Sequence, residues 1–529
     1  MISDTRSPCD EAVVQSAPDC GSPASGKWVL AATILGSGIT FIDGTVVNVA
    51  LPVLQSELGA SVSAAQWIIE GYALILSALI LVGGALGDHY GRKRIFLIGS
   101  LIFAAASAWC GLSPGINNLI VARCVQGFGA ALLVPGSLAL ISANFDKSRR
   151  GRAIGTWAGF TSIAAGIGPV LGGWLIQAFS WRWIFFINIP LAVVLLLITF
   201  KYVPESRDQD STTNVDWVGA LLATVGLGGI VFGLIESNTA GLAAPRVIAF
   251  LVIGVLGLVA FLFVEDKKKQ PMMPLELFRI RTFTGANLLT LFLYAGLGGL
   301  LFFLPFNLIQ VQGYSPAAAG AALLPFVITM FALGRWAGGL VERYGSKIPL
   351  VVGPLIAGAG FALFAVPGSV DHGYWIDFFP AVMVMSFGMA VSVSPLTTTV
   401  MGAVEVRHAG LASGINNAVS RTAGLIAVAA FGVLMLFVFD NSFAEKLQAI
   451  QLPDDVRQNL LGQSGKFLNI EIPQGITGDA ADAVRAAVRD SFVAGFRVVS
   501  LVSAGLAVLS AIASWILIDG KKQKGHEDE

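Results

Sequence analysis

The chain has 529 residues, of which 55% are hydrophobic and 12% are charged, and its formal net charge is zero. A soluble protein of this length needs many more charged residues on its surface, so the composition excludes a soluble globular protein and indicates an integral membrane protein. The net charge is uninformative, but the placement of the charges is not. The basic residues concentrate in alternate loops between long apolar segments.

Apolar segments long enough to cross a bilayer recur along the chain, since a span needs about 20 such residues. Residues 1–26 are rich in Ser, Pro, Asp and Gly and lack the pattern of a cleavable signal, so we expect a disordered cytoplasmic tail there. A second cytoplasmic tail is expected at 519–529. The fourteen expected spans are 27–51, 65–87, 95–113, 117–142, 153–178, 183–200, 217–236, 246–264, 283–308, 316–340, 348–367, 375–400, 410–437 and 492–518.

The stretch GALGDHYGRKR at 84–94 lies between the second and third spans and sets the orientation. Cytoplasmic loops are enriched in Lys and Arg, so this loop should face the cytoplasm. With fourteen spans, both termini lie on one side and every second loop is cytoplasmic. The short loops on the other side contain only Arg182 and Arg246 as basic residues. We therefore expect a multi-pass protein of the cytoplasmic (inner) membrane with both termini inside.

The same stretch has a fainter copy later in the chain, at one constant offset. The matching pairs are Gly84 with Gly338, Leu86 with Leu340, Asp88 with Glu342, Tyr90 with Tyr344, and Gly91 with Gly345. Because transporter folds commonly arise by duplication, helices 1–6 should correspond to helices 9–14. This predicts an N-terminal six-helix bundle at 27–203, two inserted helices with flanking loops at 204–282, and a C-terminal six-helix bundle at 283–518.

One segment outside the cytoplasm is long. Residues 438–491 carry charges of both signs and helical stretches such as 480–489. Long loops escape the charge rule, so their composition does not orient them. The segment is either a solvated extracytoplasmic cap or a docking surface for a partner, and whether a periplasmic adaptor binds is left open.

Several ordered motifs carry a family resemblance over residues 27–518. They are GALGDHYGRKR at 84–94, FIDGTVVNVALP at 41–52, RCVQG at 123–127, GIGPVLGG at 166–173, WRWIFFINIP at 181–190 and QVQGYSP at 310–316. Together they resemble the major facilitator superfamily and, within it, the fourteen-helix drug/proton antiporter family. The resemblance implies an all-α fold of two six-helix bundles plus two inserted helices. The chain departs from relatives in having Glu70 in helix 2, and in having Arg335 in helix 10 where some polyspecific exporters carry an acid.

Four ionisable residues within spans are candidates for proton coupling and for the transport cavity: Asp43, Glu70, Arg123 and Arg421. Such residues cost a few kcal/mol on insertion and usually face a cavity or a partner. Asp43, Glu70 and Arg123 are expected at similar depth, where burial favours a neutral carboxyl group and a nearby Arg favours a charged one. That balance would let Asp43 take up and release protons. Alternatively, Asp43 only pairs with a neighbour, Glu70 reaches interfacial water, and Arg421 is a structural partner rather than a substrate contact.

Two further groups of residues are expected to act through conformation. We expect Asp88 and Arg92 to form a cytoplasmic latch that holds the two bundles together in one state. The resemblance assigns the latch motif to Gly84, Asp88, Gly91, Arg92 and Lys93. It also implies an antiporter-type bend of helix 5, sealing the cavity against proton leak, at Gly168, Pro169, Gly172 and Gly173. Small residues let helices approach closely, and proline removes a backbone donor.

The chain has no visible ATPase and no HExxH zinc-protease motif, so we expect an ion gradient as the energy source, no cofactor, and a transporter rather than an enzyme. Cys9, Cys20, Cys110 and Cys124 form no CxxC pair and have no histidine at metal spacing, so neither a disulfide nor a metal site is expected. The expected partners are a small-molecule substrate, protons and the lipid bilayer, but no nucleic acid.

The predicted function is proton-coupled export of small lipophilic or cationic compounds. One alternative is an exporter dedicated to one endogenous metabolite or lipid precursor. Another is a membrane sensor or assembly protein that does not transport.

Overall fold

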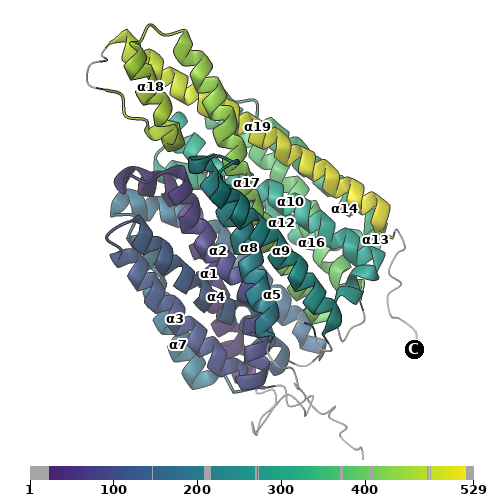
Figure 1. Ribbon diagram of the computed structural model, residues 1–529. Helices are drawn as coiled ribbons and strands as arrows, with labels where there is room; N and C mark the ends of the chain where they lie inside the picture. Colours follow the sequence, from purple (N-terminus) through teal and green to yellow (C-terminus); the bar gives the residue numbers. More distant parts are fainter. Residues whose placement is uncertain are drawn as a thin grey trace, which may run out of the picture.

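The computed structural model describes residues 23–145, 147–207, 216–268, 271, 273–369, 373–404, 409–473, 476 and 478–519. The expected tails therefore lie almost entirely outside the described residues. The described part is helical (Figure 1). Its α-helices are α1 Pro23–Glu57, α2 Val62–Tyr90, α3 Arg92–Leu112, α4 Ile116–Asn144, α5 Lys147–Ala178, α6 Trp183–Phe186, α7 Asn188–Tyr202, α8 Trp217–Ala240, α9 Pro245–Lys267, α10 Arg281–Phe306, α11 Pro316–Ala321, α12 Leu324–Gly338, α13 Leu340–Tyr344, α14 Lys347–Leu363, α15 Tyr374–Asp377, α16 Phe379–Gly402, α17 Ala409–Gln448, α18 Asp454–Gly462 and α19 Asp479–Leu517.

Each of the fourteen expected spans coincides with one helix or with consecutive short helices. Among the described residues, thirteen helical segments are long and apolar enough to cross a membrane. The remaining expected span, 348–367, is α14, an apolar helix of 17 residues. The predicted class, an all-α integral membrane protein, is confirmed, with one span shorter than expected.

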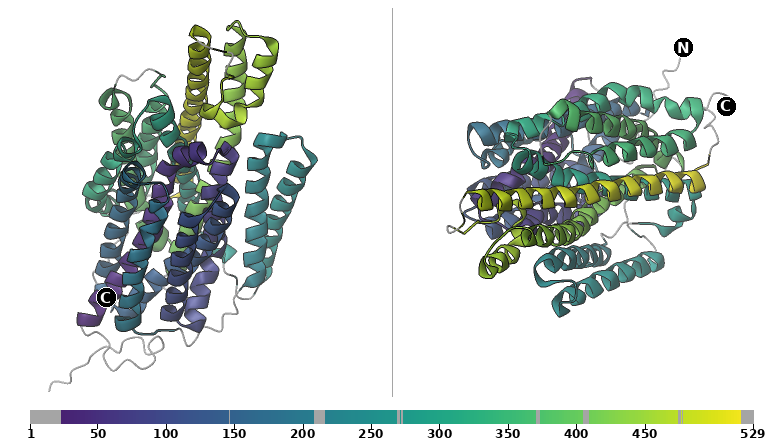
Figure 2. Two further views of the ribbon diagram at one scale, coloured as in Figure 1. Left: turned by 90° about the vertical axis from the view of Figure 1, so that its left-hand side faces the viewer. Right: turned by 90° about the horizontal axis from the view of Figure 1, so that it is seen from above.

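The helices form two bundles with a separate helix pair beside them. Helices α1 to α7 pack together, as do α10 to α19, whereas α8 and α9 pair with each other, and α8 rests on α2 and α17. Figure 2 shows this pair standing to one side of the bundles. Glycines bring its two helices close together, since a Cβ added at Gly229 would lie 2.8 Å from the Cα atom of Gly254. Such an approach of backbones is the usual way for helices to associate in a membrane.

The two copies of the basic loop motif have the same backbone geometry. Gly91 ends α2 with φ 108°, and Gly345 ends α13 with φ 75°. Only glycine adopts this left-handed region without strain, so each copy ends one helix and lets the next begin at once. The next helices are α3, from Arg92, and α14, from Lys347.

The last two membrane helices extend beyond the ends expected for their spans. Helix α17 continues past residue 437 to Gln448, and α19 begins at Asp479 rather than near 492. With α18 they form a helical projection (Figure 1), which we name the cap and which comprises the described residues between 438 and 491. Hydropathy ends a span at the first charges, whereas these helices continue because one face of each remains apolar.

The cap has an aromatic core. Phe439 lies 5.4 Å from Phe443 and 5.2 Å from Phe467 between ring centroids, and Phe467 lies 6.1 Å from Phe492. All four rings are buried. They join α17, the 3₁₀ turn at Ser464–Asn469 and α19 into one packed unit. The segment is therefore a folded extension of the C-terminal bundle, and we name the membrane side that carries it the cap end.

Candidate functional site

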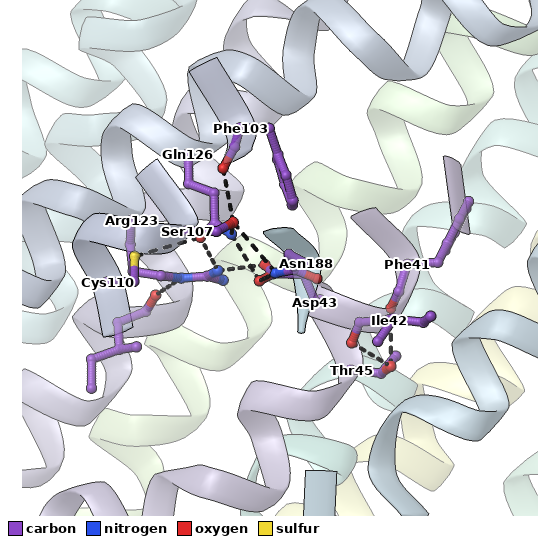
Figure 3. A network of polar contacts seen from close by, with 12 residues as sticks. Phe41, Ile42, Asp43, Thr45, Phe103, Ser107, Cys110, Arg123, Gln126 and Asn188 are labelled. Carbon is purple, nitrogen blue, oxygen red and sulfur yellow. Dashed lines mark hydrogen bonds and ion pairs between the residues drawn. The ribbon is translucent and has the colours of Figure 1, made fainter. Parts of the chain in front are cut away.

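Asp43 on α1 and Arg123 on α4 form the centre of a buried polar network (Figure 3). Arg123 Nη1 lies 2.5 Å from Asp43 Oδ2 and 2.6 Å from Gln126 Oε1. Arg123 Nε donates to the carbonyl oxygen of Ile68 at 3.0 Å, and its guanidinium lies 4.2 Å from the ring centroid of Tyr72. Four neighbours thus hold one guanidinium, so its charge is compensated inside the membrane.

The other carboxylate oxygen of Asp43 also has donors. Gln126 Nε2 donates to Asp43 Oδ1 at 2.8 Å, and Asn188 Nδ2 donates to the same atom at 3.0 Å. Gln126 Nε2 also donates to Ser107 Oγ at 2.8 Å. Asp43, Gln126 and Asn188 are completely buried. Helices α1, α3, α4 and α7 each contribute a polar side chain, so the network ties the N-terminal bundle together.

Glu70 is not part of this network. It is completely buried on α2, and neither of its carboxyl oxygens has a hydrogen-bond partner among the described residues. The structure thus brings Asp43 and Arg123 into contact, as their expected depth suggested, but leaves Glu70 alone. A charged carboxylate without donors is very costly to bury, so this conformation accommodates Glu70 as the neutral acid.

Arg421 lies between the two bundles. Its guanidinium carbon is 6.0 Å from the ring centroid of Phe41, which places a side chain of α17 against α1. The side chain is half-buried, in contrast to that of Arg123. Of Arg335, also noted in the sequence, only the helical backbone of α12 is described, not the side chain.

The expected latch residues are held within the N-terminal bundle. Arg92 Nε lies 2.8 Å from Asp88 Oδ1, so this ion pair joins α2 to α3 rather than one bundle to the other. The carboxylate of Glu205 accepts from the backbone N–H groups of Lys93 and Arg94 at 2.9 and 3.2 Å. It therefore occupies the N-terminus of α3, where a negative charge is favourable. The segment after α7 thus fastens the basic loop in this conformation.

Small residues of α5 bring the two bundles together towards the cap end. A Cβ at Gly172 would lie 2.2 Å from a methyl carbon of Val46 on α1, and one at Gly173 would lie 2.2 Å from the carbonyl oxygen of Pro316 on α11. On the facing helix, a Cβ at Gly320 would lie 2.1 Å from the carbonyl oxygen of Pro169. Helix α5 is therefore pressed between its own bundle and the other one, and the contact leaves no space for larger side chains.

A second contact closes the same end. Gln66 on α2 donates from Nε2 to the carbonyl oxygen of Val428 on α17 at 2.9 Å, and its Oε1 accepts from Asn238 on α8 at 3.3 Å. Nearer the cap, Gln310 donates to the carbonyl oxygen of Pro52 at 3.4 Å. Both bundles and the separate helix pair thus meet on the cap side of the membrane.

The sequence interpretation missed several residues of the site. Gln126 and Asn188 lie inside quoted motifs but were not assigned roles, although an amide within an apolar span is a signal of its own. Ser107 has no comparable signal, because serine commonly bonds to its own helix, as Ser107 also does with Phe103. Glu205 belongs to a polar connection, and only the fold shows that it reaches α3.

Two bundles of membrane helices, with charged residues buried between helices and one end closed by small residues, have the architecture of a secondary transporter. The chain belongs to the Major Facilitator Superfamily, whose family model matches residues 33–428. The family resemblance inferred from the motifs is thereby confirmed.

Relatives and solved structures agree with this assignment. The chain is 31% identical to the multidrug resistance protein Stp of Mycobacterium tuberculosis (strain CDC 1551 / Oshkosh), over 92% of this chain and 91% of the relative. It is 32% identical to the puromycin resistance protein pur8 of Streptomyces alboniger, over 99% and 97% of the two chains. A bacterial homologue of the human lysosomal transporter Spinster shares the fold, with a TM-score of 0.63 at 18% identity over 94% of this chain and 98% of that one.

Proposed function

We propose that this protein is a proton-coupled antiporter that exports small lipophilic or cationic compounds, drugs among them. Support comes from relatives of about 30% identity, which are named for resistance to several drugs or to puromycin and match nearly the whole chain. A relative at 30% identity is the tetracenomycin C resistance and export protein of Streptomyces glaucescens, whose name specifies one compound. This name and that of the puromycin relative both favour the second candidate, an exporter dedicated to one compound.

The proposed location is the cytoplasmic (inner) membrane, with both termini and the end opposite the cap in the cytoplasm. Basic residues support this orientation because they cluster at helix termini away from the cap, and such clusters mark cytoplasmic loops. They include Arg92, Lys93, Arg94, Lys201, Lys267, Lys268, Arg281 and Lys347. In this orientation the closed end faces outward, and the bundles would rock to open it.

The proton carrier we propose is Glu70 rather than Asp43. Its helix is joined to the network of Asp43 and Arg123 through the carbonyl oxygen of Ile68, which accepts from Arg123. Two carboxyl groups lie buried within the spans of one bundle, but only Asp43 has donors for its charge. Glu70 has none in this conformation, so opening of the closed end to water would be needed for it to lose its proton. This difference between the two carboxyl groups is the observation that carries the proposal. A proton gradient would then supply the energy, without a cofactor.

The basic loop acts in this proposal as a conformational latch. In this conformation the bundles are closed at the cap end and not at the cytoplasmic end. The ion pair between Asp88 and Arg92 therefore stays within the N-terminal bundle. The latch would engage the C-terminal bundle in the opposite state. Asp88→Asn should then slow transport but leave substrate binding largely intact. A large loss of binding would contradict the latch.

A susceptibility panel in an efflux-deficient host tests the function. The wild type is compared with Asp43→Asn and Glu70→Gln, with the amounts of membrane protein matched. Resistance to many unrelated compounds that both variants lose supports a multidrug antiporter, whereas resistance to one compound supports the dedicated exporter. Purified wild type that moves no compound into liposomes under a proton gradient would instead indicate a sensor or assembly protein.

A further inference from the structure

Helix α17 carries a polar stripe that leads into the space between the bundles. Ser413, Asn417 and Arg421 are spaced four residues apart and therefore share one face, with Ser420 beside them. Asn417 is exposed and the other three are half-buried. An accessible polar face within a membrane span belongs next to water or cargo rather than lipid. The stripe begins towards the end opposite the cap, so it is reached from the side that the proposed orientation makes cytoplasmic.

Arg421 lies at the end of this stripe nearer the cap, and no described residue compensates its charge. No hydrogen bond or ion pair joins it to another described side chain or carbonyl, and its neighbours include the ring of Phe41 and the side chain of Tyr72. By comparison, the guanidinium of Arg123 has an ion pair, two further hydrogen bonds and an aromatic face. Both arginines lie within membrane spans, so the difference marks Arg421 as the one left free for a ligand.

The acidic groups nearby are not placed to bind a cationic cargo. Asp43 and Glu70 are both 0% exposed, so neither touches a molecule entering between the bundles in this conformation. Asp43 is also bound to Arg123, and Glu70 is accommodated as the neutral acid. Within the described part of the membrane region, the accessible charge between the bundles is therefore positive.

We propose that Arg421, with Asn417 and the face of Phe41, binds the acidic group of an amphiphilic organic anion as cargo. This inference rests on the proposed export function and changes its cargo class. Among lipophilic compounds it selects those with an apolar body and a carboxylate or similar group, and it disfavours cations. A guanidinium binds a carboxylate through two parallel hydrogen bonds, and the bond is strong where water is scarce. Phe41 supplies apolar surface beside that charge for the body of the cargo.

A matched pair of fluorescent probes tests the charge preference. Pyrenebutyrate and pyrenebutyltrimethylammonium carry the same apolar body with opposite charges, and their affinities for the purified full-length protein are measured by fluorescence titration. The wild type should bind pyrenebutyrate at least about tenfold more tightly than the cation. Arg421→Gln should weaken pyrenebutyrate binding by about tenfold or more and leave the affinity of the cation unchanged or higher. Arg421→Lys should retain part of the anion affinity.

The control variant is Arg343→Gln, which removes an exposed cation from α13 and should change neither affinity. A wild type that prefers the cation would overturn the proposal. The proposal would also be overturned if Arg421→Gln and Arg421→Lys both lost affinity for the anion and for the cation to the same extent, because that pattern indicates a structural role.

The same proteins in liposomes separate this inference from the proposed function. If binding of pyrenebutyrate depends on Arg421 but a proton gradient moves neither probe, the binding site stands and the export function fails. If the gradient drives transport of either probe but pyrenebutyrate binds wild type and Arg421→Gln equally tightly, the export function stands and the anion site fails.

Discussion

Arg123 on α4 and Asp43 on α1 share Gln126 as a common partner, because its Oε1 accepts from the guanidinium and its Nε2 donates to the carboxylate. The amide therefore bridges the two charges on the side of Ser107. An arrangement of this kind responds as a unit, since no member can move without breaking bonds of the other two. The charge pair is thus a rigid element of the N-terminal bundle.

Asp43→Asn should destabilise the protein and abolish proton-coupled efflux. The substitution leaves the guanidinium of Arg123 buried without a counter-charge, which costs about 3–5 kcal/mol when a buried pair is broken. Thermal unfolding in detergent measures the loss. The double variant Asp43→Asn/Arg123→Gln removes both charges and should recover most of the melting temperature without recovering efflux. Coupled efflux at the wild-type rate in either variant would contradict the coupling role.

Glu70→Gln should keep the fold and lose coupling. Gln matches the shape of the neutral acid but cannot release a proton, and the site already offers no donor to a charge. The melting temperature should fall by little or not at all, while gradient-driven efflux is lost and downhill movement of substrate continues. Glu70→Leu should be at least as stable as the wild type because it removes a buried unpaired polar group. A large loss of stability in both variants would reveal a bonded, structural carboxylate instead.

Gly173→Leu should open the seal at the cap end. The added side chain meets the backbone of Pro316 and Ala317, which cannot move as a flexible side chain could. We expect an increased passive proton leak, measured with a pH-sensitive dye inside liposomes, together with a lower melting temperature. Gly44→Ala is the matched control, because a Cβ there has no atom within 4 Å. Equal leak rates in the wild type and in Gly173→Leu would show that this contact does not seal the membrane.

Glu205→Gln should loosen the basic loop. The carboxylate occupies the N-terminus of α3, and loss of such a capping interaction costs about 0.5–2 kcal/mol. Hydrogen exchange of the amides of Lys93 and Arg94 should become faster. Glu276→Gln, an exposed acid after the separate helix pair, serves as the control and should leave that exchange unchanged. Unchanged exchange in Glu205→Gln would mean that other contacts hold the loop.

Hydropathy and charge were sufficient to predict the spans approximately, because each membrane helix must be apolar along most of its length. Thirteen of the fourteen are long enough to cross a membrane, and α14 is shorter. Similar depth and opposite charge made a contact between Asp43 and Arg123 a reasonable prediction, and the structure has it. The separation of Glu70 from that pair could not be predicted, since depth says nothing about the face of α2 on which a residue lies. Two residues at equal depth on neighbouring helices meet only if both point at the shared contact.

The cap shows a different limit of sequence patterns. Phe439 and Phe443 recur at helical spacing beyond the expected end of their span, but the charges between the apolar residues hide the continuation. Phe467 packs against them from a turn whose backbone adopts φ 51°, which a propensity argument would not select. Contacts between distant segments, rather than local preferences, determine this part of the fold.

The length of α17 and α19 has a consequence for experiments on the working cycle. Because both helices run without interruption from the C-terminal bundle into the cap, a small rotation of that bundle swings the tip of the cap through a much larger arc. Gln55 on α1 lies within hydrogen-bond reach of the cap, 3.4 Å from the carbonyl oxygen of Lys466. The distance between two spectroscopic labels, one on α1 and one on the cap, would therefore change with each opening of the protein, and it can be measured at a site away from the transport cavity.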